Sequence, residues 1–461
     1  MLPMTKLARG RFGLVMLYFA LLPVTLPAQS RSFAPESDEE QLPYAMRSKM
    51  EELPTITVGR SDAVISGTDQ RALQAAIDYV AGLGGGTVVI GPGEYVLHDS
   101  IHLRSYITLR GTKGQTILRK ASCVVSPLAL DGDYGEEQIT VADAKGFDVG
   151  CGVAIWDSES GGFHTTVARI TGKKGNTLAI DHPLLSDCMV SNKAQAATVF
   201  PVVSGCNIQG ARIEDLIVDG NRKENVALNG CRGGGIYLCR AYGTIIERCT
   251  VKSFHGDGIS FQQSNDVVVA ACVSEDNADL GIHPGSGSQR AVVRECAARR
   301  NGGDGLFLCW RVRHGLFEKN ILEDNGRFGI SIGHKDSDNL LLRNTVRGNH
   351  QDGIHFRNEI EGMAAHRNRL LDNLIEDNGV GADAAGVRIR GETSRLVFRG
   401  NVIRDTRPAE ARRQAVGIRI EDLAGEVVLE ANQIEAKTPV EDLRKPLPAT
   451  AGGEAAPKPS R

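Results

Sequence analysis

Histidine, lysine, arginine and tryptophan side chains gather in three successive segments, which follow Gly305, Gly329 and Gly353. Together these segments contain Trp310, Arg311, His334, Lys335, His355 and Arg357. Removing a proton next to a carboxylate requires a base and a cation that stabilises the resulting enolate. The composition therefore suits proton abstraction from an acidic molecule, provided that the fold brings the three segments together.

Each role in such a reaction has named candidates. The predicted base is Lys335 or His334, and the predicted neutralising cation is Arg311 or Arg357. His283, in the motif LGIHPGSGSQ (280–289), is a further catalytic candidate, because other repeats have Ser, Phe or Tyr at its position. The alternative interpretation is that exposed histidine and lysine side chains only solvate the surface.

Carboxylates would serve a different reaction, the hydrolysis of a glycosidic bond by a pair of acids. Asp257 and Asp304 are the candidates; like Asp352, each directly precedes a repeated glycine, and Asp279 lies two residues before one. Asp-Gly is also ordinary turn chemistry, so a structural role is the favoured interpretation of these aspartates.

A repeat of glycine followed by an aliphatic residue must position these groups. The glycines are separated by steps of 23, 23, 24, 24, 24, 33 and 31 residues, and they are Gly235, Gly258, Gly281, Gly305, Gly329, Gly353, Gly386 and Gly417. So short a period predicts stacked coils. Apolar and polar residues alternate after each glycine, which indicates two or three short strands per coil, and the glycines are expected at sharp turns.

A second series runs in phase with the first. Cys249, Cys272, Cys296, Asn320 and Asn344 each lie nine residues before the next repeated glycine, and Asn373, Asn401 and Asn432 continue the series. The asparagine amides are predicted to stack and to hydrogen-bond from coil to coil. The three cysteines are predicted to be free and buried. For the other cysteines, a Cys151–Cys188 or Cys231–Cys239 disulfide is left open, because sequence cannot fix connectivity.

Stacked coils would place the residue two positions after each glycine on one sheet face, about 4.8 Å from its neighbours. These residues are Tyr237, Ser260, His283, Phe307, Ser331, His355, Arg388 and Arg419. Trp310, His355, Arg357 and Tyr237 are the predicted substrate-binding residues, since cations suit carboxylates and an aromatic ring suits a sugar. Longer turns around 359–366, 379–385 and 407–415 are expected to border this face.

The N-terminal stretch of the repeat region is GTDQRALQAAIDYVAGLGGGTVVIGPGEYVLHDSIHLRSYITLRG, residues 67–111. Thr68 or Asp69 can cap a helix with Leu73, Ala76 and Ile77 on one face. This stretch resembles the start of the pectate-lyase-like superfamily, and the resemblance covers roughly residues 55–436. It implies an all-β fold, a single-stranded right-handed parallel β-helix (solenoid) with an N-terminal capping helix.

The resemblance also implies a range of activities: polysaccharide lyase, polygalacturonase-like hydrolase, uronate epimerase, or the glycan binding and cutting of phage tailspikes. The chain departs from two of these patterns. HGDGIS (255–260) has one acid where polygalacturonases have adjacent aspartates, and the Asp-His constellation of pectate lyases is missing.

The remaining segments define the domain organisation. Lys6, Arg9 and Arg11 before the apolar run 12–26 predict a signal peptide at 1–28, and hence a secreted or periplasmic protein. A linker at 29–54, the β-helix at 55–436 with a β-rich insertion at 121–200, and a disordered tail at 437–461 follow. Cleavage would change the net charge from −3 to about −6, which gives no reason to expect nucleic acid.

The expected function is carbohydrate-active, namely action on an acidic extracellular polysaccharide by β-elimination or epimerisation. The first alternative is an inverting glycoside hydrolase of the polygalacturonase-like type. The second is a non-catalytic glycan-binding or surface scaffold protein, for which Trp310 and the cations would suffice. No cofactor or metal is assigned, although the carboxylates would allow calcium. A polysaccharide partner, no membrane insertion and a monomer are expected.

Overall fold

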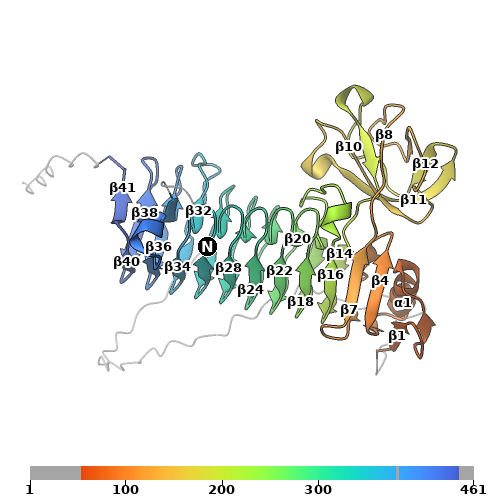
Figure 1. Ribbon diagram of the computed structural model, residues 1–461, viewed down its shortest axis with the longest axis horizontal. Coiled ribbons are helices and arrows are strands. Elements are labelled where there is room, and N and C mark those ends of the chain that lie inside the picture. The colour runs from red at the N-terminus through yellow and green to blue at the C-terminus, as the bar shows by residue number, and fades with distance from the viewer. Residues whose placement is uncertain (1–52, 380–383, 446–461) are drawn as a thin grey trace, which may run out of the picture. The chain divides into compact units, whose positions relative to one another are not determined.

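The computed structural model describes residues 53–379 and 384–445. Within them, three long parallel sheets surround one continuous apolar core, and a repeated coil contributes one strand to each sheet (Figure 1). The chain is therefore a three-sheet parallel β-helix, and the predicted two or three strands per coil are three.

We name the parallel sheets A, B and C and give their strands in spatial order. Sheet A contains β2 (Ile65–Ser66), β1 (Thr55–Gly59), β3 (Gly86–Ile90), β6 (Ile107–Arg110), β15 (Arg212–Glu214), β18 (Ile245–Glu247), β21 (Val268–Ala270), β24 (Val292–Arg294), β27 (Leu316–Glu318), β30 (Leu340–Leu342), β33 (Arg369–Leu371), β36 (Leu396–Arg399) and β39 (Val427–Glu430). Sheet B contains β4 (Gly93–Leu97), β7 (Thr116–Lys120), β16 (Ile217–Asp219), β19 (Thr250–Lys252), β22 (Val273–Glu275), β25 (Ala297–Arg299), β28 (Ile321–Glu323), β31 (Thr345–Arg347), β34 (Leu374–Glu376), β37 (Val402–Arg404) and β40 (Gln433–Glu435). Sheet C contains β5 (Ile101–His102), β14 (Val203–Gln209), β17 (Ile236–Tyr242), β20 (Ile259–Gln262), β23 (Ile282–Gly285), β26 (Leu306–Phe307), β29 (Ile330–Ile332), β32 (Ile354–Phe356), β35 (Ala384–Ile389), β38 (Gln414–Ile420) and β41 (Thr438–Asp442).

The repeated glycines are explained by close packing. A Cβ atom on Gly329 would lie 2.2 Å from Cγ1 of Val346 and 2.8 Å from the carbonyl oxygen of Gly353 in the next coil. Gly329 lies at a bend of the chain, as expected, but it does not have a positive φ, so close packing explains why this residue is glycine. Only a residue without a side chain leaves room for the neighbouring backbone.

The predicted asparagine ladder is confirmed. Asn344 donates from Nδ2 to Oδ1 of Asn373 (2.9 Å) and accepts from Nδ2 of Asn320 (3.0 Å). Asn401 and Asn432 extend the same pattern. The backbone N–H of Cys296 donates to Oδ1 of Asn320, so the cysteines do continue the ladder, and Cys249, Cys272 and Cys296 are free and buried.

A second ladder, which was not predicted from the sequence, lies at the opposite ends of the sheet B strands. It contains Asn277, Asn301, Asn325, Asn349, Asn378 and Gln414, and each member after Asn277 accepts from the side-chain amide of the member before it. Both ladders satisfy buried polar groups at the bends of the coil.

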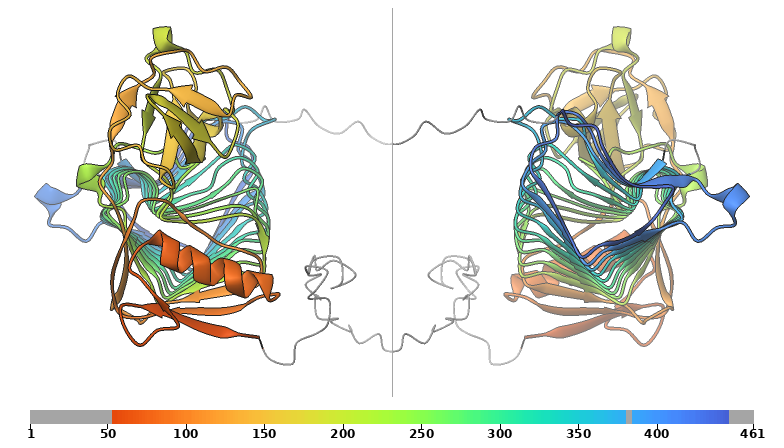
Figure 2. Two further views of the ribbon diagram at one scale, coloured as in Figure 1. Left: turned by 90° about the vertical axis from the view of Figure 1, so that its right-hand side faces the viewer. Right: turned by 90° about the vertical axis from the view of Figure 1, so that its left-hand side faces the viewer.

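The predicted capping helix is α1 (Gln70–Gly82), and Asp69 is its N-cap, accepting from the backbone N–H groups of Arg71 and Ala72. Leu73, Ala76, Ile77 and Val80 of α1 are buried in the main core. The end-on views in Figure 2 show the stacked coils superposed, with α1 lying across their N-terminal end. The helix thus covers core that a further coil would otherwise cover.

The predicted insertion folds as an antiparallel sheet with a core of its own. In spatial order its strands are β8 (Val125–Pro127), β13 (Gln195–Ala197), β10 (Gly152–Trp156), β11 (Thr166–Lys174), β12 (Thr177–Ile180) and β9 (Gln138–Thr140). Phe147, Ile155 and Ile170 are among its buried residues. Short 3-10 turns η3 (Gly162–His164), η4 (Val190–Asn192), η5 (Arg222–Glu224) and η6 (Ala409–Ala411) complete the described elements.

The prediction of a disordered tail from residue 437 is wrong at its start. β41 (Thr438–Asp442) pairs in register with β38, so the last coil extends to residue 442. This last coil carries Glu430, Glu435, Glu441 and Asp442, and Pro439 lies within β41. The predicted signal peptide, most of the predicted linker and the rest of the tail lie outside the described residues.

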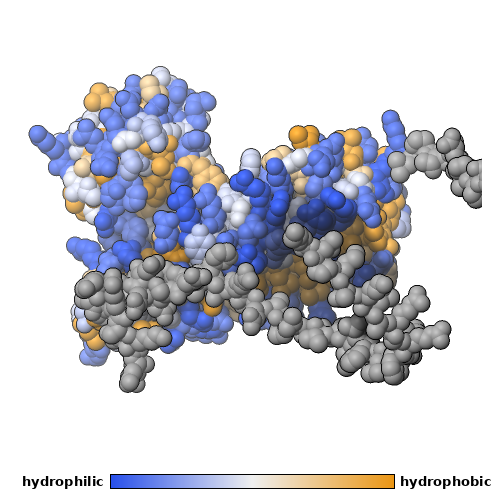
Figure 3. All heavy atoms as spheres, turned by 180° about the vertical axis from the view of Figure 1, so that it is seen from behind, coloured by the Kyte–Doolittle hydropathy of each residue, from blue (hydrophilic) through white to orange (hydrophobic). Residues whose placement is uncertain are grey.

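All ten cysteines, which lie within the described residues, are free. Neither pairing left open by the sequence is therefore present, and the in-register neighbour of Cys239 is Cys206 rather than Cys231. On the face shown in Figure 3, hydrophilic side chains predominate and hydrophobic ones form smaller patches. This distribution agrees with a core enclosed by the coils.

Candidate functional site

The predicted file of outward residues on sheet C is in register. Tyr237 pairs with Ser260 and Ser260 with His283; Phe307 pairs with Ser331, Ser331 with His355, and His355 with Arg388, which pairs with Arg419. The His283 and Phe307 rings meet edge to face, 5.2 Å between centroids. We call these residues the outward file. Stacking therefore brings side chains two dozen positions apart into one line.

Several residues of the outward file are shielded from solvent although they face away from the core. His283 is 5% exposed, His355 7%, and Ser331 only 1%. Ser260 donates to the carbonyl oxygen of Gly230 (2.7 Å), so the segment before β17 covers this part of the file. Tyr237 is also buried, and its hydroxyl donates to the carbonyl oxygen of Cys231 (2.8 Å).

Two histidines of the file are each joined to a buried carboxylate. Nδ1 of His283 lies 2.7 Å from Oδ2 of Asp257, and Nδ1 of His355 lies 2.9 Å from Oδ2 of Asp352. Among residues 53–379 and 384–445, no group hydrogen-bonds to Nε2 of either ring. A carboxylate on Nδ1 orients the ring and stabilises its protonated form, which prepares Nε2 to accept a proton.

The His355–Asp352 pair opens onto a pocket of about 310 Å³. The Phe328 ring stacks on His355 at 4.1 Å, and His350 and Gln351 line the same pocket. Arg388 donates from Nε to Asp352 (3.0 Å) and lies 3.4 Å from Glu421. Arg390, also in the lining, forms no ion pair with any described residue, so its charge is available to an anion.

His334, one of the two predicted bases, has partners at both ring nitrogens. Nε2 lies 2.9 Å from Oε1 of Glu359, and Nδ1 lies 3.6 Å from Sγ of Cys309. The ring stacks on Trp310 at 5.1 Å. Burial, together with the charge of Arg357, lowers the pKa of His334. These contacts make His334 a less accessible proton acceptor than His283 or His355.

Lys335 and Arg311 lie next to His334 and Trp310 in the chain. Lys335 is partly exposed and Arg311 exposed. Neither side chain forms a hydrogen bond or ion pair with the part of the chain that the structure describes. The assignment of Lys335 as base and Arg311 as neutraliser stays a prediction.

Arg357, the other predicted neutraliser, reaches back across two coils. It donates to Oγ of Ser331 (2.8 Å) and to the carbonyl oxygen of Leu308 (2.6 Å), and it lies over the Phe307 ring. It also pairs with the buried Asp336 at 3.1 Å. Burial nevertheless raises the pKa of Asp336 to about 7. Arg357 thus packs beneath the surface and binds the coils together.

The predicted hydrolytic acids are both buried turn aspartates. Asp257 accepts from His283 and from the backbone N–H of Leu280, whereas Asp304 accepts from the backbone N–H of Phe328 and pairs with Arg327 (3.2 Å). Asp279 differs, because its side chain is 56% exposed. Surrounding protein atoms, which limit hydration of the carboxyl group, and the neighbouring charge of Asp257 raise the pKa of Asp279 to about 6.

No group of three or more His, Cys, Asp or Glu side chains within residues 53–379 and 384–445 is arranged to hold a metal ion. The possibility of calcium stays a prediction. No helix among the described elements has the length and apolar character needed to cross a bilayer.

Comparison with known proteins defines the class first. The stacked three-strand coils are those of parallel β-helix proteins, and a family described as "Right handed beta helix region" matches residues 189–359 and 308–440. The two spans cover more than half of the chain, so the chain belongs to this family. No curated protein sequence matches it.

Solved structures share the fold at low sequence identity. The A-module of the mannuronan C-5 epimerase AlgE4 of Azotobacter vinelandii is 16% identical, with a TM-score of 0.50 over 82% of this chain and 96% of that chain. The AlgE6 A-module of the same organism is 18% identical (TM-score 0.49, 82% and 95%). The tailspike gp49 of Pseudomonas phage LKA1 is 14% identical (TM-score 0.37, 78% and 73%). The similarity to the AlgE4 A-module concerns the fold.

Sequence analysis singled out His355 but missed most of its pocket. Phe328 directly precedes a repeated glycine, and His350 and Gln351 directly precede Asp352, so none occupies the expected outward position. Arg390 could have been found, because it follows Arg388 at a spacing of two and so lies on the same face.

Proposed function

We propose that this chain acts on an acidic polysaccharide by abstracting the proton next to a uronate carboxylate, with β-elimination or C5 epimerisation as the outcome. The observation that carries the proposal is the His355–Asp352 pair, whose ring lies in a pocket with the unpaired cation of Arg390. The AlgE4 A-module, named a mannuronan C-5 epimerase, shares the fold and makes mannuronan a sensible member of the substrate panel.

In this reaction Arg390 binds the carboxylate of the substrate and offsets the negative charge that develops on it. Nε2 of His355 takes the C5 proton, while Asp352 holds Nδ1 and stabilises the imidazolium. In elimination the electron pair forms the C4–C5 double bond as the C4–O bond breaks, and the leaving oxygen takes a proton. In epimerisation water delivers a proton to C5 from the opposite face, and the His355 imidazolium returns its proton to solvent.

The test compares His355→Ala and Arg390→Gln with wild type on a panel of uronate-containing and neutral polysaccharides. Ultraviolet absorbance reports an unsaturated uronate, reducing ends report hydrolysis, and NMR reports epimerisation. We expect His355→Ala to lower turnover about 10²- to 10⁴-fold while binding is retained. His182→Ala, with a side chain 67% exposed in the insertion, and Arg369→Gln on the exposed face of β33 are the matched controls.

Full activity of His355→Ala would refute His355 as the base, and His283→Ala then tests the second pair. A wild-type protein that binds uronates without turning any of them over would refute catalysis and leave a glycan-binding protein.

Hydrolysis is the second candidate, because Asp279 has both an exposed side chain and a raised pKa, as a general acid requires. New reducing ends without ultraviolet absorbance, lost in Asp279→Asn but not in His355→Ala, would establish it in place of proton abstraction.

Export is part of the proposal. The basic residues and apolar run at positions 6–26 suit a secretory signal, and a glycan outside the cytoplasm is then within reach. Cell fractionation with N-terminal sequencing of the mature chain tests it; a cytoplasmic chain that begins at Met1 would contradict it.

A further inference from the structure

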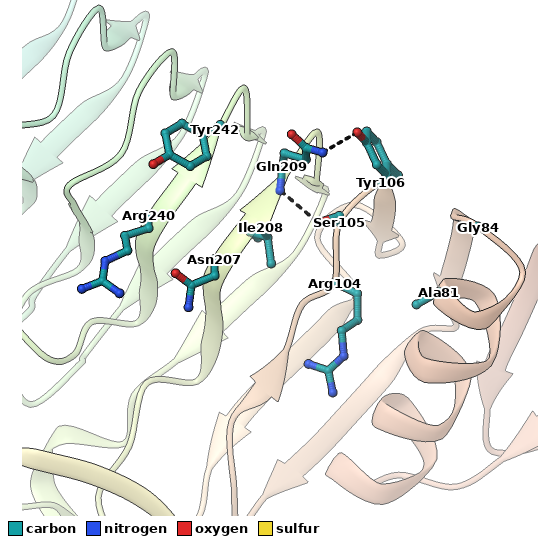
Figure 4. A pocket seen from close by; sticks show the side chains of 10 residues that line it. All are labelled: Ala81, Gly84, Arg104, Ser105, Tyr106, Asn207, Ile208, Gln209, Arg240 and Tyr242. Carbon is teal, nitrogen blue, oxygen red and sulfur yellow. Dashed lines mark hydrogen bonds between the residues drawn. The ribbon is translucent and has the colours of Figure 1, made fainter. Parts of the chain in front are cut away.

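A second pocket, of about 560 Å³, lies on the first coils, where β14 and β17 adjoin the turn after β5 (Figure 4). Its lining includes two cations, two tyrosines and two side-chain amides: Arg104, Arg240, Tyr106, Tyr242, Asn207 and Gln209. None of these residues belongs to the pocket of His355. Charge, aromatic rings and amides together are suited to a sugar that carries acid groups.

The cations face one side of this pocket. In Figure 4 the side chains of Arg240 on β17, Asn207 on β14 and Arg104 in the turn after β5 extend toward the same side. Arg104 pairs with Asp78 at 2.9 Å, and Arg240 donates from Nε to Gln263 at 3.1 Å, so each guanidinium is oriented and retains other N–H donors. The amide of Asn207 makes no side-chain hydrogen bond with any described residue.

The tyrosines supply flat apolar surfaces. Tyr106 and Tyr242 are each 39% exposed, so part of each ring faces solvent. Nε2 of Gln209 donates to the Tyr106 hydroxyl at 2.6 Å, and this bond holds the ring in place (Figure 4). A sugar ring can stack on such a surface while its acid groups reach the arginines.

A line of corner residues leads from the pocket to the region around Trp310. Asn207, Arg240, Gln263, Ser286, Trp310 and His334 all have positive φ, between 43° and 64°. The residues just before five of them, Cys206, Cys239, Gln262, Gly285 and Cys309, pair in register from coil to coil. One left-handed corner residue per coil therefore forms a single line from the pocket to the Trp310–His334 stack.

We propose that this pocket is an accessory binding site for a uronate-containing oligosaccharide, which continues along the corner line toward Trp310. The ligand class rests on the proposed function, whereas the location rests on the pocket itself. The site would hold a polymer away from the reacting unit and so strengthen the binding of long chains but not of short ones.

The experiment measures binding of uronate hexasaccharides (mannuronate, guluronate, galacturonate and glucuronate), and of a neutral hexasaccharide, to the full chain by calorimetry. We expect Arg104→Gln and Arg240→Gln each to weaken binding of the preferred hexasaccharide about 5- to 10-fold, and the double variant about 50-fold. Turnover of a uronate trisaccharide should remain unchanged in the double variant. Arg369→Gln is the control.

Unchanged hexasaccharide affinity in the double variant, or equal affinity for the neutral hexasaccharide, would overturn the accessory site. The proposed function would stand in that case if His355→Ala still abolished turnover. Conversely, weakened binding in the double variant of a protein that turns over no uronate would support the accessory site and refute the proposed catalysis.

Discussion

Two lines of side chains run along the same coils and follow opposite rules. The ladder through Asn320, Asn344 and Asn373 repeats one residue type, and each amide bonds to the next. The outward file on sheet C changes residue at almost every coil, from serine to histidine to phenylalanine. Both lines share the coil period, so position alone does not distinguish them.

The difference lies in what each line bonds to. A ladder amide satisfies, and is satisfied by, its neighbours in the line, so an apolar residue in place of an asparagine leaves buried groups unpaired. An outward residue bonds to turns and loops instead, as His355 does to Asp352 and Ser260 to Gly230. The line that repeats one residue type therefore stabilises the fold. The line whose residues vary forms the face that can carry a functional site.

Breaking the ladder should give the largest effect on stability. Asn344→Leu removes donors to Phe317 and Asn373 and an acceptor for Asn320, all buried. We expect the free energy of unfolding to fall by about 4 kcal/mol in urea titrations. Cys272→Ala in the same line should cost about 1 kcal/mol. Equal losses in the two variants would show that the amides contribute no more than packing.

A pH experiment tests a buried acid, Asp336, next to the outward file. Asp336 pairs with Arg357, which donates to Ser331 of that file. Burial raises its pKa to about 7, so the folded chain binds a proton that the unfolded chain releases near pH 4. Its contribution to stability is present at low pH and is lost as the pH rises to 7, by up to about 1.4 kcal/mol per pH unit.

Asp336→Asn cannot titrate, so the stability of wild type minus that of the variant should increase from pH 7 to pH 4. Urea titrations at both pH values measure this difference. A difference that instead grew with pH would mean that the ion pair with Arg357 outweighs burial.

The smallest effect is expected at Trp310, which is 45% exposed and stacks on His334. Trp310→Ala should weaken binding of a uronate oligosaccharide about tenfold, while stability changes by less than about 0.5 kcal/mol. Tyr134→Ala, at a ring 72% exposed in the insertion, is the control in calorimetry. A stability loss as large as that of Asn344→Leu would show that Trp310 stabilises the fold rather than binds the ligand.

The repeated features of this molecule could be predicted from the sequence. The spacing of Gly329 and Asn344 predicted the phase of the coils, and the α1 cap followed from Asp69 and its apolar stripe. The second ladder through Asn301 and Asn325 was equally readable, because its members are 24 residues apart.

The candidate site was only partly predictable, because its contacts come from residues outside the period. Gly230 covers Ser260 from the long turn between β16 and β17, and Arg357 reaches Leu308 across two coils. Whether His334 has free nitrogens depends on Glu359, which lies in an inserted loop. Such contacts depend on the length and direction of side chains and loops in space. The spacing of residues in the sequence does not predict them.

The coil formed by β39, β40 and β41 affects whether further strands can pair with it. A solenoid has no intrinsic length, and its terminal strands present backbone groups to which an identical chain can add, giving fibres. Here the three final strands carry Glu430, Glu435 and Glu441, and Pro439 lacks the N–H that continued pairing requires. Pro439 therefore removes one donor from β41, which makes this coil a poorer template for a further strand.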